Sequence, residues 1–131
     1  MIGDHTPVPT LAVKDLGKAR EFYEGVLGLE PGPDMPGGVA YKAGSGGLFV
    51  YESEFAGTNQ ATAMMMEVPE GAFDEQISDL RGKGVTFETY DMPETEWQDG
   101  VATMSMGDSS FRSVWFRDPD GNILNLGTGM G

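Results

Sequence analysis

Two runs that are rich in apolar residues flank a turn near the end of the chain. The runs at residues 111–117 and 123–126 are rich in β-branched, aromatic and aliphatic side chains, which favour strands. Between them, Pro119 presets φ for the first corner of a turn, and Asp120 tolerates the second. Gly121 supplies the positive φ that reverses the chain. The pattern predicts a β-hairpin, which is compatible with many functions.

The start of the chain predicts a strand followed by an amphipathic helix. Residues 7–13 form an apolar run with its prolines at the beginning, where a strand tolerates them. Asp15 stands where the N-cap of a helix belongs, and Gly28 stands where the helix ends. Apolar side chains at three- and four-residue spacing mark the buried stripe of this helix: Leu16, Ala19, Phe22, Tyr23, Val26 and Leu27.

Two strands and a polar linker complete the first half. Residues 39–43 and 48–52 are apolar runs joined by a turn that is rich in glycine, so they predict a second hairpin. The polar stretch at residues 53–60 follows it, and we place the boundary between two half-domains there.

The second half repeats this order. Residues 62–68 predict a strand, a helix then closes at residues 81–84, and residues 85–88 resume a strand. Moving the second half back by 55 positions lays Val68 on Val13. The apolar face of the predicted helix carries Phe73, Ile77 and Leu80.

The stretch from residue 90 to residue 110 is too long for a simple connector. Residues 92–100 are predicted to form a loop, and residues 101–106, which alternate weakly, are predicted to form an added strand. Long loops in compact domains are often functional lids, so Met92 and Trp97 become candidates for the lips of a binding site.

Several of these stretches together carry a family resemblance. The run at residues 11–16, the Phe22-Tyr23 pair, the run at 26–29 and the stretch at 115–122 resemble the vicinal oxygen chelate superfamily, the group of glyoxalases, bleomycin resistance proteins and extradiol dioxygenases. The resemblance spans about residues 7–126 and implies an α+β fold, with two tandem βαβββ modules forming a curved mixed sheet around a cavity. It implies one domain over residues 1–131, with module one at about 6–56 and module two at about 61–127.

Composition excludes several functional classes. The chain has 131 residues, a formal net charge of −13 and no cysteine. Nucleic acid and anionic membranes are therefore disfavoured as partners, while a cationic ligand would be attracted. Disulfides and thiolate metal sites are excluded. The start resembles no signal peptide and no apolar run reaches membrane-spanning length, so we expect a soluble, cytoplasmic protein.

The residues at the metal-ligand positions of the superfamily are unsuited to a metal. Carried over by the resemblance, the ligand positions fall on Val8, Ala63 and Asn125, and a fourth falls near Glu52. Val8 and Ala63 have no donor atom, and one carboxylate holds a catalytic ion weakly. His5 is the only histidine. We therefore predict no metal and no other cofactor, and we keep Glu52 as a weak catalytic candidate.

A binding cavity remains as the predicted site. Strand alternation places small residues on its floor and aromatic residues on its walls, an arrangement that suits a planar ligand. Arg112 and Arg117 are the counter-argument, because two guanidinium groups facing the cavity would clamp an anion; we expect Arg117 to pair near Asp118 instead. The predicted ligand-binding residues are Val8, Thr10, Tyr41, Phe49, Tyr51, Ala63, Met65, Met92, Trp97, Trp115 and Asn125.

The leading hypothesis is a metal-independent protein that binds a small organic ligand, aromatic or cationic in character. The resemblance to bleomycin resistance proteins suggests that it sequesters an antibiotic-like compound. The alternative is an enzyme of the superfamily, a lyase, isomerase or dioxygenase-like protein, acting through cavity carboxylates or an unrecognised metal site. We also expect a homodimer, since open sheets have edges that need cover.

Overall fold

The structure is a computed structural model that describes residues 1–128, without the side chain of Met106. The described residues form two compact units: Met1–Ala61 with the turn Asp118–Asn122, and Thr62–Arg117 with residues 123–128. The first unit contains η1 (Ile2–Asp4), β1 (Thr10–Val13), α1 (Leu16–Arg20), η2 (Glu21–Val26), β2 (Glu30–Pro31), β3 (Gly38–Ala43) and β4 (Gly46–Glu52). The second contains β5 (Thr62–Val68), α2 (Glu70–Gly82), β6 (Thr95–Gln98), β7 (Val101–Met106), β8 (Ser109–Arg117) and β9 (Ile123–Thr128).

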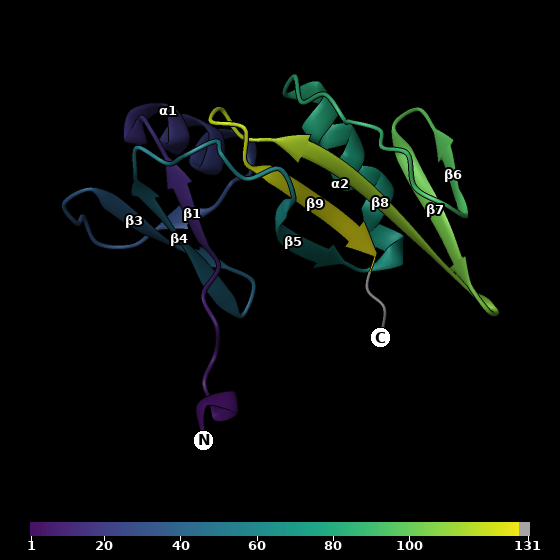
Figure 1. Cartoon of the computed structure of the whole chain (residues 1–131), viewed down its shortest axis with the longest axis horizontal. Helices are drawn as coiled ribbons and strands as arrows, with labels where there is room; N and C mark the ends of the chain where they lie inside the picture. Colours follow the sequence, from purple (N-terminus) through teal and green to yellow (C-terminus); the bar gives the residue numbers. More distant parts are fainter. Residues whose placement is uncertain (129–131) are drawn as a thin grey trace. The chain divides into compact units, whose positions relative to one another are not determined.

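Each unit is built on one mixed sheet, so the fold is α+β as predicted. The first sheet has the order β1-β4-β3-β2, and β1 runs parallel to β4. The second has the order β5-β9-β8-β7-β6, which can be followed in Figure 1, and β5 runs parallel to β9. The βαβββ order is present in both halves, with β6 as an additional strand in the second. The strands form two mixed sheets, one from each of the two predicted modules.

The first unit confirms the predicted helical stripe. Asp15 caps α1, and its carboxylate accepts a hydrogen bond of 3.1 Å from the backbone N–H of Lys18. The α-helix passes into the π-helical η2, which is a wider helical segment. Gly28 has a φ of +72° after the helix, as expected for a glycine at a helix end. The helix residues buried in the core are Ala19, Phe22 and Tyr23.

The turn Asp118–Asn122 joins β8 to β9 but groups with the first unit. The buried carboxylate of Asp118 accepts from the hydroxyl of Tyr23 at 2.8 Å. It also accepts from the backbone N–H groups of Asp120 and Asn122 and from the amide Nδ2 of Asn122. The same Nδ2 donates to the backbone carbonyl of Ala12 in β1 at 2.8 Å. Burial and the Asp118 carboxylate together raise the pKa of Tyr23, so its hydroxyl stays protonated and keeps donating.

In the second unit, α2 covers one side of the sheet. Phe73, Ile77 and Leu80, the predicted apolar face, are all buried. The guanidinium of Arg112 in β8 lies 4.6 Å from the centre of the Phe73 ring, so the side of β8 that carries Arg112 faces α2. Strand alternation places the core residues of β8 and β9 on that same side: Val114, Phe116, Leu124 and Leu126.

Two predicted segments differ from the structure. The predicted loop at residues 92–100 contains β6, which forms a hairpin with β7. Its two-residue turn is Asp99-Gly100, with φ of +52° and +81°, a dipeptide that favours hairpins of this kind. The predicted strand at 85–88 reduces to one bridge between Glu88 and Trp115. Because β7 already pairs with β8 over residues 109–113, only a short part of β8 remains to pair with residues 85–88.

Within residues 1–128, no helix is long and apolar enough to cross a membrane.

Candidate functional site

The helix-distal face of the first sheet, defined by Thr10, Ala12, Phe49 and Tyr51, brings several predicted site residues together. Thr10 pairs with Phe49 and Ala12 pairs with Tyr51 in the β1–β4 register. The Phe49 and Tyr51 rings are stacked, 6.1 Å apart and nearly parallel at 9°. Tyr51 is 36% exposed. This face therefore offers an accessible ring. Its hydroxyl, on Tyr51, takes part in none of the hydrogen bonds found among the described residues.

Three other predictions for the first unit need correction or comment. Tyr41 is not on this face: it is 3% exposed, its ring stacks on that of Tyr23 at 6.0 Å, and its hydroxyl donates to Glu24. The β3–β4 register pairs Tyr41 with Leu48, which places it on the helix side with the core. Val8 lies before β1 and is 55% exposed, rather than forming a floor. Glu52 is exposed at the end of β4.

The helix-distal face of the second sheet, defined by Met65, Trp97, Trp115 and Asn125, brings together a larger set. The register runs Met65–Asn125–Trp115 across β5, β9 and β8. The β8–β9 pairing is continuous, so Trp115 lies on the side opposite Val114 and Phe116, whereas the β5–β9 pairing shifts between Thr62 and Met64. Trp97 pairs with Ala102 in the β6–β7 hairpin, and its ring lies 6.0 Å from that of Trp115. Both indoles are half-buried. They form a partly exposed aromatic surface.

Tyr90 joins these indoles and was not predicted as a site residue. Its ring meets that of Trp115 edge-on at 6.0 Å and 88°. Its hydroxyl donates to Glu88 at 2.9 Å, and the other oxygen of Glu88 accepts from Nε of Arg117 at 2.6 Å. Arg117 therefore pairs with Glu88, not near Asp118 as expected. The Arg117 hydrogen bond lowers the pKa of Glu88, which keeps the carboxylate charged, and burial raises the pKa of Tyr90.

Hydrogen bonds fix Trp115 as well. Its indole Nε1 donates to the hydroxyl of Thr62 in β5 at 3.1 Å, and its backbone carbonyl accepts from the N–H of Glu88 at 2.8 Å. A large aromatic side chain that is held by its polar atom presents its ring at low entropic cost on binding. The Trp115 ring is thus preorganised for contact with a planar group.

Asn125 differs from its neighbours because it is 2% exposed. Its Nδ2 donates to Oγ of Ser113 and to the carbonyl of Val114, both at 3.2 Å. Its Oδ1 is buried and has no hydrogen-bond partner among the described atoms. At this face, β9 thus carries a buried amide whose carbonyl oxygen lacks a hydrogen-bond donor.

The remaining second-unit candidates differ in exposure. Met65 is 61% exposed, and Ala63 and Met92 are half-buried. Glu67, the carboxylate of β5, is exposed. Three exposed carboxylates lie within three residues of Trp97 along the chain: Glu94, Glu96 and Asp99.

The residues at the superfamily's metal-ligand positions do not fit a metal. Val8 and Ala63 provide no donor, and Asn125 provides one neutral carbonyl oxygen. Among the described residues, no group of three or more histidine, aspartate and glutamate side chains is placed to hold an ion. The donor set therefore gives no basis for a step that runs through a metal.

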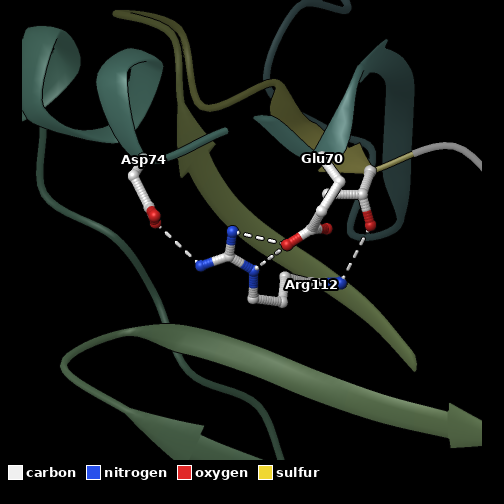
Figure 2. Close-up of polar contacts among 4 residues, drawn as sticks. Glu70, Asp74 and Arg112 are labelled. Atoms are coloured by element: carbon white, nitrogen blue, oxygen red, sulfur yellow. Dashed lines mark hydrogen bonds and ion pairs between the residues drawn. The ribbon is translucent and has the colours of Figure 1, made fainter. Parts of the chain in front are cut away.

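Arg112, the second arginine considered as an anion clamp, lies on the α2 side of the sheet. It borders a cavity of about 750 Å³ lined by Glu67, Val68, Pro69, Glu70, Ser110, Arg112 and Thr128. Figure 2 shows its guanidinium held between Glu70 and Asp74 of α2, with contacts of 2.7 Å to each. The hydrogen bond to Asp74 raises its pKa further. Two carboxylates already pair with the Arg112 guanidinium, so the cavity is a poor site for a further anion.

Comparison with known proteins places this geometry in context. The sequence profile described as Glyoxalase/Bleomycin resistance protein/Dioxygenase superfamily matches residues 4–126. No curated protein matches the chain by sequence. Among solved structures, the fosfomycin resistance protein FosX from Listeria monocytogenes, complexed with Mn(II) and sulfate, has a TM-score of 0.73 at 18% identity and covers 99% of this chain and 93% of its own.

Two further structures are similar. FosX from Mesorhizobium loti has a TM-score of 0.69 at 17% identity, with 99% of this chain and 95% of that chain covered. Lactoylglutathione lyase from Agrobacterium tumefaciens has a TM-score of 0.67 at 22% identity, with 95% and 93% covered. At these identities the likeness is one of fold, and it confirms the predicted architecture.

Proposed function

Because the chain belongs to the glyoxalase/bleomycin resistance protein/dioxygenase superfamily, we propose that it is a metal-independent member that binds a small organic molecule with planar rings. The observation that carries this proposal is the helix-distal face of the second sheet. There, the partly exposed indole of Trp115 pairs in the register with Asn125, the residue at the position of the superfamily's metal-binding carboxylate, and the Trp97 ring lies 6.0 Å from that of Trp115. Ring stacking and burial of apolar area supply the binding energy.

Charge supports a neutral or cationic ligand. The chain has a net charge of −13, and exposed carboxylates flank Trp97 along the chain at Glu94 and Asp99. The carboxylate of Glu96 adds to this charge from the α2 side of the sheet. Such a field draws cations toward the site and slows anions. The two arginines that would have favoured an anion are both engaged, Arg112 by Glu70 and Asp74 and Arg117 by Glu88.

Adaptable side chains favour a tolerant binding site. Met65 is largely exposed beside Asn125 in the register, and Met92 lies two residues beyond Tyr90. Unbranched thioether side chains adjust to ligands of different shape. A protein that sequesters a toxic, antibiotic-like compound needs affinity without chemistry, and that is the role we propose here.

The test is isothermal titration calorimetry with three planar probes of different charge: 9-aminoacridine as the cation, carbazole as the neutral ring system and naphthalene-2-carboxylate as the anion. The cation and the neutral probe are expected to bind and to be recovered unchanged, and the cation's affinity is expected to fall as salt is raised. Binding confined to the carboxylate would contradict the proposal, as would turnover of a bound probe.

Metal independence is tested in the same experiment. Titration after treatment with EDTA is expected to give the same affinities and the same melting temperature, since metal removal destabilises a protein only if the folded state binds the ion. A loss of binding that added Mn(II) or Zn(II) restores would instead favour the enzyme alternative with an unrecognised metal site.

A further inference from the structure

The free carbonyl oxygen of Asn125 is the one feature of the second helix-distal face that ring stacking leaves unexplained. The residue is 2% exposed, and Oδ1 has neither a protein partner nor contact with solvent among the described residues. A buried acceptor without a donor destabilises a fold, and most buried polar groups are therefore paired. An apolar residue would fill the same strand position without this penalty.

The orientation of the amide is set by its other end. Nδ2 reaches two acceptors, Oγ of Ser113 and the backbone carbonyl of Val114. A carbonyl group can only accept, so an amide turned the other way would place Oδ1 against the oxygen of Val114. Both Nδ2 hydrogens are used in this orientation, and Oδ1 is the one atom of the amide that is available to a ligand.

Gly127 presents no side chain beside this oxygen. It is the next residue of β9 on the same face, and a Cβ added to it would lie 3.4 Å from Oδ1 of Asn125 and 2.7 Å from Oγ of Ser113. Any side chain at this position would therefore pack against the amide and crowd the serine. The absence of a side chain at position 127 and the unpaired oxygen are independent observations about the same place.

We propose that Oδ1 of Asn125 selects ligands that carry an N–H or O–H donor on or beside their planar ring. This inference rests on the proposed function and adds the ligand class: a donor-bearing aromatic molecule, such as an aromatic amine, an N–H heterocycle or a phenol. Trp115, paired with Asn125 in the β8–β9 register, supplies the ring contact, and Asn125 supplies the acceptor. An anionic group is rejected there, because a carbonyl oxygen repels it.

The proposal requires that a ligand donor reach the oxygen, and we infer that it does so from the β5 side of the face. Met65 pairs with Asn125 in the β5–β9 register and is 61% exposed, and an unbranched thioether side chain can adjust to a ligand. Because Oδ1 has no hydrogen bond in the described protein, a ligand donor can bind it without breaking a protein hydrogen bond. This makes the gain from a single donor larger than it would be at a solvated acceptor.

The experiment compares carbazole with 9-methylcarbazole. The two share one ring system, and methylation removes the only hydrogen-bond donor. The full chain is expected to bind carbazole about three- to tenfold more tightly, the range for one neutral hydrogen bond. In Asn125→Leu the two probes are expected to bind equally. Gly127→Ala, which fills the space beside Oδ1, is expected to reduce the preference and provides a second variant if Asn125→Leu does not fold.

Thr103→Val is the matched control. Thr103 pairs with Arg112, so it lies on the α2 side of the sheet, and its substitution is expected to leave the preference for carbazole intact. Equal binding of both probes by the unaltered chain, or a preference that persists in both Asn125→Leu and Gly127→Ala, overturns this inference and leaves the proposed function standing. Binding of neither probe overturns the proposed function and the inference together.

Discussion

The two units carry the same order of elements, and Asp118 in the first and Asn125 in the second are buried polar side chains with different hydrogen bonding. Each unit also holds one buried side-chain oxygen without a partner among the described residues, Oδ2 of Asp120 in the first and Oδ1 of Asn125 in the second. In the first, the Asp118 carboxylate accepts from Tyr23, from two backbone N–H groups and from an amide, so both of its oxygens are paired. In the second, Asn125 donates twice through Nδ2 and leaves its oxygen unpaired. A complete network stabilises a fold, whereas an incomplete one leaves a group free to meet a ligand.

The helix-distal faces of the two units also differ in how their aromatic rings are held. Phe49 and Tyr51 in the first unit stack on each other. In the second, Trp115 is tied to Thr62, and Tyr90 is tied through Glu88 to Arg117, so ring positions are set by polar contacts. The rings of the second helix-distal face are thus held by polar contacts, and this is why we propose the binding site there.

The largest expected effect is on the free energy of unfolding, through the hydrogen bonds of Asp118. Asp118→Ala is expected to lower the free energy of unfolding by about 3 kcal/mol, because it leaves buried donors on Tyr23 and in the turn without an acceptor. Urea denaturation followed by circular dichroism measures the change. Asp74→Ala, which removes an exposed partner of Arg112, serves as the control, with an expected change below about 1 kcal/mol. Equal effects would remove the contrast between buried and surface networks.

The next effect concerns the two aromatic faces. Trp115→Ala is expected to weaken carbazole binding at least about tenfold, since it removes a fixed ring that stacking ligands need. Tyr51→Ala, the corresponding truncation in the first unit, is expected to weaken it by less than about threefold, because that ring has no polar anchor in the described contacts. Fluorescence titration of carbazole measures both. A larger loss in Tyr51→Ala would move the site to the first unit.

The smallest effect is a pH dependence in the second unit. The pKa of Glu88 is lowered in the folded chain, first by its hydrogen bond from Arg117. Its contribution to stability is therefore present above the ordinary glutamate pKa and is lost as pH falls through the lowered folded value. Glu88→Gln is expected to be less stable than the unaltered chain at neutral pH, by under about 1 kcal/mol for this part-exposed pair.

Thermal unfolding of both proteins from neutral pH to about pH 3 follows this contribution across the range in which glutamates titrate. The two curves are expected to converge at the acid end, where Glu88 is protonated and resembles glutamine. A gap that stays constant with pH would show that the carboxylate charge is not what holds Tyr90 and Arg117.

The sequence alone determined most of the helices and strands and the buried stripe of each helix. The β5 strand was predicted with the same limits that the structure shows, and the buried positions of α2 and the hairpin at β8 and β9 follow from residue spacing and turn chemistry. These properties are local, because the period of a strand or helix sets which residues share a side. The Asp99-Gly100 turn was also readable, since such dipeptides favour hairpins, but the prediction treated that segment as a loop.

Only the tertiary structure decided which polar atoms meet. Arg117 lies next to Asp118 in the sequence but pairs with Glu88, which is distant along the chain, and Tyr41 entered the core because the β3–β4 register turned it toward the helix. Tyr90 became part of the candidate site through Glu88. The unpaired oxygen of Asn125 depends on where Ser113 and Val114 lie in the neighbouring strand. Hydrogen bonds form over about 3 Å, so the separation of two residues along the chain does not predict whether folding brings them close enough to pair.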